Sequence, residues 1–536
     1  MNLLNTASLQ IYHDLMHRTF NKGFSLLLLS ASFIWFGCSS QQAVLQPQES
    51  YSDKSAYLED RQQLLRADSL TAFDADLQLN AKEMVVNEKL IKLREQMKAD
   101  YQQTGFFPPT HPFLKSKEHI ESTRLYQLFQ QMPKGGMLHL HASAAVDFEW
   151  LVDEAIRTPD CYVYWEDDNQ KYTKGQLHFY LPEEVPEGFY LTQLMARSRP
   201  DFRDELYDLI TLELEEVEKD SFDVWDEFQV IFQRIGGFYT YRPIFEKYNR
   251  RIFEDLLADG IQHVEIRSAM RGLYDLEHEA SSDYYTGDST VQIFQQITND
   301  IREEYPQFTL KLIYTSLRFF SQEVILQELK SAFEYRSRYP ELIRGFDLVA
   351  NEDDGNTTLF FLDNWLKMDS LQQIYGIDMP LFLHDGESNW HTVKNLYDAV
   401  LLDSKRIGHG FNLNFYPVLQ EMIKAQEICL EICPLSNQIL GYVKDLRVHP
   451  ANYLLRRGIQ CTISSDDPSI FGYSGISYDY WTIFLAWQLD LQAIKKLAMN
   501  SLTYSSLSDS EKQKAMAHWQ QEWDTFIDFA DNFLDE

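Results

Sequence analysis

The 536-residue sequence has few cysteines and few basic residues, and each shortage excludes a class of protein. Its five cysteines form no CxxC pair, so neither a disulfide framework nor a zinc ribbon is expected. Lys and Arg number 48 against 81 Asp and Glu, a formal charge of −33, which disfavours nucleic acids and anionic lipid surfaces as partners. Neither a GxxxxGK[ST] phosphate loop nor a GxSxG nucleophile elbow is present. The composition, 44% hydrophobic, is otherwise that of a folded protein with a substantial core.

Four of the cysteines lie in apolar or strand-like runs, which predicts ordinary buried thiols: Cys161, Cys429, Cys433 and Cys461. Cys38 differs, because it ends a 14-residue apolar run, 24–37, that follows Arg18 and Lys22. That run is too short to span a bilayer and has the length of a signal-peptide core. The chain may be translated from Met1 or from Met16.

The segment around Cys38 resembles the lipobox of bacterial lipoproteins, although Trp35 and Phe36 are bulkier than usual there. The resemblance implies a signal peptide at 1–37, lipidation of Cys38, and a protein anchored to the bacterial envelope on the periplasmic side or the cell surface. The alternative is a plain secretory signal with an incidental cysteine, which would give a secreted protein. No later segment reaches a membrane-spanning length, so contact with a membrane is expected only through the lipid.

The rest of the chain divides by composition and periodicity. Residues 38–75 are rich in Gln, Ser and Asp and suit a flexible tether. Residues 76–132 form a predicted helical extension, with an amphipathic helix at 79–100 and another helix at 117–131. Residues 133–510 form the predicted main domain, and 511–536 a C-terminal helix.

The main domain contains eight short apolar or β-branched runs, most of them separated by stretches with helical periodicity. These runs lie at 137–141, 263–267, 310–315, 343–349, 381–384, 405–409, 428–433 and 460–465. Strands that alternate with helices favour parallel βα units, and eight such units predict an α/β fold, a (β/α)8 TIM barrel. The first two runs are more than 120 residues apart, so an insertion is expected after the first strand, at about 160–220.

Polar motifs stand where four of these strands end. They are His139-Leu140-His141, His384-Asp385-Gly386-Glu387, Gly408-His409-Gly410 and Ser465-Asp466-Asp467-Pro468. The C-terminal rim of such a barrel is where its chemistry occurs, and residues two apart on a strand point the same way. Imidazoles and a carboxylate that converge there suit a divalent metal such as zinc. By contrast, His263 begins its strand, and the PCxxC half of a cytidine-type deaminase signature is missing, so His263 is expected to be structural.

These motifs resemble those of the adenosine deaminase family, and most closely its secreted branch, the adenosine deaminase-related growth factors. The similar segments run from about residue 79 to about 480 and include MPKGGMLHLH, GFDLVANED, HDGESNW, RIGHGFNL, ICPLSNQ and SSDDPSIFG. The resemblance implies a zinc-dependent TIM barrel that hydrolyses adenosine or 2′-deoxyadenosine to the inosine product and ammonia.

Matching motif to motif, the resemblance implies a role for each of several residues. One Zn²⁺ per chain would be held by His139, His141, His384 and Asp466. Glu387 would protonate N1 of the purine, and His409 would lie beside the attacking water. Asp467 and the backbone at Gly345 would contact the purine, with Trp225 near the nucleoside and His278 in a loop over the site.

Two departures from the family concern the sugar. Relatives carry a ribose-binding aspartate after the paired histidines, where this chain has Ala142-Ser143-Ala144, and Asp385 replaces a small residue of the family motif. If His384 faces the metal, strand alternation predicts that Asp385 points away from it. The alternatives are therefore a deaminase of another 6-aminopurine, such as adenine or a modified nucleoside, and a non-catalytic surface binding module. AMP is disfavoured because no cluster of Lys or Arg accompanies the motifs.

Residues 79–131 also resemble the helical extension that the secreted branch uses to dimerise. An amphipathic helix outside a barrel needs an apolar partner surface. We therefore expect a homodimer in which this segment takes part. The alternative is a helix that folds back on its own barrel.

Overall fold

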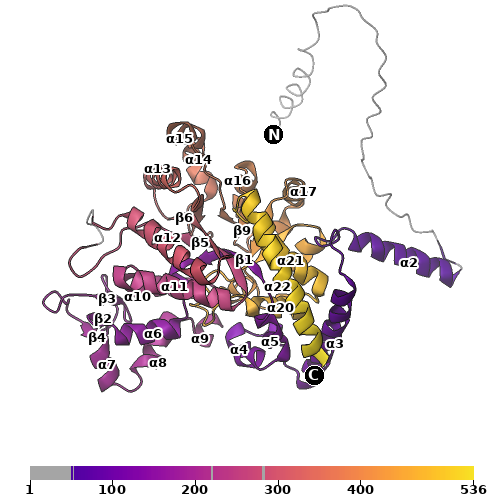
Figure 1. Cartoon of the computed structure of the whole chain (residues 1–536), viewed down its shortest axis with the longest axis horizontal. Coiled ribbons are helices and arrows are strands. Elements are labelled where there is room, and N and C mark those ends of the chain that lie inside the picture. The colour runs from indigo at the N-terminus through magenta and orange to yellow at the C-terminus, as the bar shows by residue number, and fades with distance from the viewer. Residues whose placement is uncertain (1–49, 52, 219–220, 280–283, 536) are drawn as a thin grey trace, which may run out of the picture. The chain divides into compact units, whose positions relative to one another are not determined.

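The computed structural model describes residues 50, 51, 53–218, 221–279 and 284–535 (Figure 1). The predicted signal peptide and Cys38 lie outside the described residues. The chain divides into two compact units, 1–64 and 65–536, and every residue of the site belongs to the second. Helix α2, Lys54–Ser69, begins in the first unit and has no buried residue. Among the described helices, none is both long and apolar enough to cross a membrane.

Within the described residues of the second unit, eight parallel strands form its centre (Figure 1). They are β1 (Gly135–His141), β5 (Ile261–Ser268), β6 (Thr309–Leu317), β7 (Ile343–Val349), β8 (His384–Asp385), β9 (Arg406–His409), β10 (Cys429–Ile432) and β11 (Cys461–Ile463). Two four-stranded sheets result, in the orders β1-β5-β6-β7 and β8-β9-β10-β11. Parallel bridges from Phe346 to Leu381 and from Leu140 to Asp466 join the edges of the two sheets. The strands therefore close into the predicted (β/α)8 barrel.

Helices follow the strands and cover the outside of the barrel (Figure 1). The principal ones are α11 (Arg242–Ala258), α12 (Gly287–Glu304), α13 (Gln322–Arg338), α15 (Met368–Tyr375), α16 (Asn395–Leu401), α17 (Pro417–Ala425), α18 (Pro434–Ile439), α19 (Pro450–Arg456), α20 (Ser477–Ala486) and α21 (Leu491–Thr503). Between β7 and α15 the chain forms a 3₁₀ turn, Thr358–Phe361, and α14, Leu362–Trp365. The thiols of Cys161, Cys429, Cys433 and Cys461 are free and buried, as predicted.

An insertion separates β1 from β5 in the sequence. It starts with α6 (Phe148–Arg157) and an antiparallel sheet in the order β3-β2-β4, made of β2 (Cys161–Tyr164), β3 (Leu177–Phe179) and β4 (Phe189–Leu191). Helices α7 (Thr192–Ser198), α8 (Phe202–Ile210), α9 (Leu214–Val217) and α10 (Ser221–Tyr239) follow. The predicted insertion, 160–220, thus holds a small sheet and three short helices. Helix α10 contributes a wall of the site described below.

The N-terminal extension is helical, as α3 (Ala81–Thr104), α4 (Phe113–Glu121) and α5 (Arg124–Gln130). The predicted helix at 117–131 is two helices, because Thr123 caps the N-terminus of α5 by accepting a hydrogen bond from Tyr126 N. Helix α3 packs on the C-terminal helix α22 (Asp509–Asp535) of the same chain. The buried Glu83 carboxylate accepts hydrogen bonds from Lys495 at 2.5 Å and from Trp523 Nε1 at 2.7 Å.

The end of the predicted tether lies against the barrel. Phe73 is buried, and its N–H donates to the carbonyl oxygen of Leu455 at 2.9 Å. Gln492 Nε2 donates to the carbonyl oxygen of Asp74 at 3.1 Å. The prediction of a flexible tether is therefore wrong for the C-terminal end of 38–75. The apolar Phe73 ring, although it stands among polar residues in the sequence, is buried in the hydrophobic core.

Candidate active site and metal centre

Three imidazoles and one carboxylate converge at the C-terminal end of the barrel. Asp466 Oδ1 lies 3.2 Å from Nε2 of His139 and 3.2 Å from Nε2 of His141. The Nε2 atoms of His141 and His384 are 3.2 Å apart. Ligand atoms of His139, His384, His409 and Asp466 lie within 4.8 Å of one another, and so do those of His141, Asp466 and Asp467. The four predicted metal ligands therefore adjoin through Asp466, and His409 lies beside them.

The two deeper histidines have fixed tautomers. His139 Nδ1 lies 2.9 Å from Glu431 Oε2, and His384 Nδ1 lies 2.6 Å from Asp347 Oδ2. A carboxylate accepts only, so each Nδ1 carries the proton and each Nε2 presents a lone pair. This carboxylate–imidazole pairing is the arrangement that orients histidines as metal ligands.

The residues fit a divalent cation. His139 Nε2 is buried without a hydrogen-bond partner among the described residues, and a ring nitrogen of His384 lies within 4.8 Å of it and of an Asp466 oxygen. Burial lowers the pKa of His384 to about 3, which keeps this imidazole neutral, the form that binds metal. Burial opposes ionisation of Asp466, but the imidazoles of His139 and His141, each 3.2 Å from Oδ1, hold its pKa well below the usual range. Three imidazoles with one carboxylate are ligands that suit zinc.

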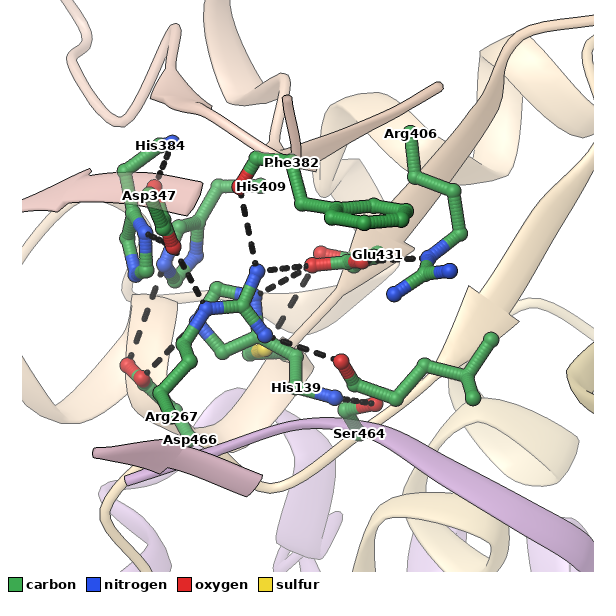
Figure 2. A network of polar contacts seen from close by, with 12 residues as sticks. His139, Arg267, Asp347, Phe382, His384, Arg406, His409, Glu431, Ser464 and Asp466 are labelled. Atoms are coloured by element: carbon green, nitrogen blue, oxygen red, sulfur yellow. Dashed lines mark hydrogen bonds and ion pairs between the residues drawn. The ribbon is translucent and has the colours of Figure 1, made fainter. Parts of the chain in front are cut away.

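Arg267 on β5 links the two supporting carboxylates (Figure 2). Its Nε donates to Asp347 Oδ2 at 2.6 Å, and its Nη2 donates to Glu431 Oε2 at 2.6 Å. Nη1 donates at 2.8 Å to the carbonyl oxygen of Leu138, the residue before His139. The fully buried guanidinium of Arg267 therefore fixes the two carboxylates that pair with His384 and His139. It also fixes the backbone of β1 next to His139.

The backbone around His409 explains the glycines of its motif. A Cβ at Gly408 would lie 3.0 Å from His139 Cε1 and 3.2 Å from the Cα of His384, so a side chain there would press on both ligands. His409 itself has φ of 60°, and Asp466 has φ of 67°. Left-handed backbone at a residue other than glycine costs about 1–3 kcal/mol, and it turns both side chains toward the site.

Glu387 presents a buried carboxyl to the same site. Its Oε1 has no hydrogen-bond partner among the described residues and lies 3.7 Å from His409 Nε2. Burial raises the pKa of Glu387 well above its usual range, and the Asp466 and Glu352 carboxylates raise it further. A raised pKa favours the protonated form of the carboxyl, the form that can donate a proton. Burial lowers the pKa of His409 well below its usual range, so that ring is neutral.

A cavity of about 510 Å³ opens beside these groups. Its polar end is formed by His141, His384, Glu387, Asp466 and Asp467, and its largely aromatic wall by Trp225, Phe228, Phe232 and Tyr239 of α10. Asp467 Oδ1 and Trp225 Nε1 are buried there without hydrogen-bond partners among the described residues. Trp225 and Asp467, predicted to lie near the nucleoside, thus both line the cavity, as do Phe228 and Phe232, which the sequence analysis did not single out.

Two other predicted positions, Gly345 and His278, do not line the cavity. Gly345 is near the start of β7, where a Cβ would meet the Phe382 ring at 2.3 Å, and it does not line the described cavity. Its assignment to the purine is wrong, because Ala350, which follows the end of β7, is the residue that lines the cavity. His278 pairs with Asp275 and stacks on Tyr284, away from the cavity lining.

Asp385 points away from the metal ligands, as strand alternation predicts. Its Oδ1 accepts a hydrogen bond from Thr358 Oγ1 at 2.6 Å and lies 3.6 Å from Arg318 Nη2. It is not among the described residues that line the cavity, so it does not replace the missing sugar-binding aspartate. His263, expected to be structural, binds Thr309 and Glu265 at the start of β5.

Comparison with known proteins gives the family. The family model described as Adenosine deaminase matches residues 208–521, and a second, described as Adenosine/AMP deaminase N-terminal, matches 32–129. The chain belongs to the adenosine deaminase family. It is 32% identical to adenosine deaminase 2 of Dictyostelium discoideum, over 89% of this chain and 88% of that protein. It is also 32% identical to adenosine deaminase 2 of Homo sapiens, over 88% of this chain and 93% of that protein.

Solved structures support the barrel of this deaminase family member. An N6-mAMP deaminase of Arabidopsis aligns with a TM-score of 0.54 at 18% identity, over 74% of this chain and 99% of that one. An amidohydrolase from Burkholderia ambifaria, solved with bound Zn, aligns with a TM-score of 0.51 at 15% identity, over 76% and 95%. At these identities the likeness concerns the fold.

Proposed function

We propose that the chain is a zinc-dependent deaminase that hydrolyses adenosine and 2′-deoxyadenosine to inosine and 2′-deoxyinosine, with release of ammonia. The observation that carries the proposal is the buried carboxyl of Glu387, with its raised pKa, in the same cavity as His141, His384 and Asp466. Hydrolysis at C6 of a purine needs an activated water on one side and a proton donor to the ring on the other. The cavity offers both kinds of group.

His139, His141, His384 and Asp466 would hold one zinc ion, which supplies Lewis-acid activation of the attacking water when it is bound. Glu387 donates its proton to N1 of the purine, so that the ring accepts the electron pair from the attack on C6. Asp467, with its unpartnered Oδ1, accepts a hydrogen bond from the purine. His409, whose Nε2 lies 3.9 Å from Asp466 Oδ2, orients the water.

The shape of the cavity favours a nucleoside over a free base. Beyond the catalytic groups the cavity continues along α10 past Phe228 and Phe232, and its volume of about 510 Å³ lies within the range of sites that enclose whole small molecules. The sugar would lie near Ser143, which lines the cavity where relatives carry an aspartate. Adenine remains the second candidate, since a structural neighbour of Arthrobacter aurescens is titled an adenine deaminase.

An ultraviolet assay of the purified protein with adenosine, deoxyadenosine, adenine and AMP tests the proposal. We expect turnover of the two nucleosides and little or none of adenine and AMP. Turnover of adenine alone would replace the proposed substrate, and turnover of none by zinc-loaded protein would leave the non-catalytic binding module.

Two further proposals concern where the enzyme acts and in what state. We propose export with a lipid anchor on Cys38, which a Cys38→Ala variant tests by its release from the membrane fraction.

We also propose a homodimer that uses α3. Because Val86 and Leu90 are buried in the chain itself, the exposed side chains of Met84 and Val85 would supply the dimer contact. Light scattering that gives a monomer at micromolar concentration would contradict the dimer.

A further inference from the structure

A line of three buried hydrogen bonds leads from the start of α19 to His409. The backbone N–H of Ala451 donates to Nδ1 of His449 at 3.1 Å. His449 Nε2 lies 3.1 Å from Asn437 Oδ1, and Asn437 Nδ2 lies 3.2 Å from His409 Nδ1. All three side chains are buried, with at most 2% of their surface exposed.

The first hydrogen bond fixes the direction of the other two. A backbone N–H can only donate, so Nδ1 of His449 accepts and carries no proton. An imidazole in that state carries its proton on Nε2, so His449 donates to Asn437. The Asn437 group that faces His449 must therefore be its oxygen. Its NH₂ group then faces His409, and Nδ1 of His409 accepts.

This order leaves one state for His409. With Nδ1 accepting, the proton of His409 lies on Nε2. That N–H has no partner among the described residues and faces the space between Glu387 Oε1, at 3.7 Å, and Asp466 Oδ2, at 3.9 Å. An Nε2 that carries a proton can donate to an oxygen placed there, but it cannot remove a proton from it.

We infer that the Ala451 amide, acting through His449 and Asn437, fixes His409 as a hydrogen-bond donor to the attacking water. His449 and Asn437 are positioning residues in this account, and His409 orients the nucleophile and is not its general base. Asp466 is then the neighbouring group free to accept the proton of the water. The inference rests on the proposed deaminase function for the identity of the nucleophile, but the tautomer of His409 does not depend on it.

The direct test is nuclear magnetic resonance of the full chain labelled with ¹⁵N-histidine. Two-bond ¹H–¹⁵N correlations report which ring nitrogen carries the proton, and loss of signals in a His409→Gln variant assigns them. We expect a protonated Nε2 and an unprotonated Nδ1 for His409 in the wild-type protein. A protonated Nδ1 would overturn the inference, whatever the enzyme turns over.

Variants of Asn437 test the effect on the reaction. Asn437→Asp replaces the donor with an acceptor of the same shape and draws the proton of His409 onto Nδ1. Asn437→Ala removes the donor but favours neither tautomer of His409. We expect kcat for adenosine to fall by about 10- to 100-fold in the Asp variant and by less in the Ala variant, with zinc content and KM little changed. A role in packing alone predicts the opposite order, and that order would overturn the inference.

A matched pair of histidine variants separates the relay from a general loss of stability. His449→Phe keeps a ring against Trp487 and Phe411 but removes both hydrogen bonds. We expect His449→Phe to lower kcat and to leave His409 with both tautomers populated. His178→Phe keeps the ring that stacks on Tyr180 and Tyr274 at the insertion and should change neither. A wild-type protein with the expected tautomer but no deaminase activity would refute the proposed function and leave the relay standing.

Discussion

Glu352 accepts a hydrogen bond from the backbone N–H of Glu387 at 2.6 Å. Its other oxygen accepts from Gly386 N at 2.9 Å and from Asn395 Nδ2 at 2.8 Å. Burial raises the pKa of Glu352, while these three N–H donors favour its ionised form, whose charge helps to raise the pKa of the neighbouring Glu387. The residue thus both places the proton donor and favours its protonated form.

Glu352→Gln should move the pH dependence of the reaction. Glu387 acts in its protonated form, so kcat/KM falls as pH rises through its raised pKa. Removing the adjacent negative charge lowers that pKa, and the alkaline limb of kcat/KM should shift to lower pH. Glu328→Gln, which removes a carboxylate bound to Tyr314 on the outside of the barrel, is the control and should leave the profile unchanged. A shift to higher pH in Glu352→Gln would contradict the role assigned to its charge.

Arg267→Lys should weaken zinc binding. A lysine ammonium is a single point of charge and cannot reach Asp347 and Glu431 together as the guanidinium does. Loss of groups that orient metal ligands typically costs about 10- to 100-fold in metal affinity, and we expect that range here. Competition with a chelator measures the dissociation constant without any activity assay.

Arg336→Lys is the control for this variant. Arg336 is also buried, but it binds Asp378 and the carbonyl oxygen of Ile343. Ile343 is the first residue of β7, at the end of the strand away from the site. Both variants lose a buried guanidinium, so both should melt at a lower temperature. Equal zinc affinity in the two variants would show that Arg267 contributes to folding alone.

Adenosine and deoxyadenosine should be turned over with similar kcat/KM. The family resemblance implies an aspartate at the ribose, where this chain has Ala142-Ser143-Ala144, and one buried hydrogen bond to a hydroxyl is worth about 1–3 kcal/mol. Asp385→Ala should leave the ratio of the two substrates unchanged, because Asp385 binds Thr358. A preference for adenosine above about 100-fold, near 2.7 kcal/mol, would mean that another group binds the 2′-hydroxyl.

Much of the barrel could be predicted because its strands are short, buried on both faces and separated by helices. Even β8, only two residues long in the structure, was found, since His384 stands at the end of an apolar run. That the proposed metal ligands would meet was expected from their places at strand ends, and the family resemblance supplied the set. Gly345 was misplaced because sequence similarity alone does not say which end of a strand a residue occupies, whereas the structure puts Ala350 at the mouth.

The residues that support the ligands were missed. Arg267 and Glu431 are 164 positions apart and pair only because β5 and β10 face each other across the barrel. A signal was nevertheless present, since Glu265, Arg267, Asp347 and Glu431 are charged residues inside apolar strands. A charge in a buried strand must find a partner, so such residues mark an internal ion network.

The most direct test of the account is a comparison of Glu387→Gln with the wild-type protein for zinc content and adenosine turnover. The glutamine keeps the shape of the side chain and loses only the proton donor. We predict one zinc per chain in both proteins and a kcat lower in the variant by about 10²- to 10⁴-fold. Zinc retained with turnover near that of the wild type would contradict the assignment of Glu387 as the acid, and with it the proposed reaction.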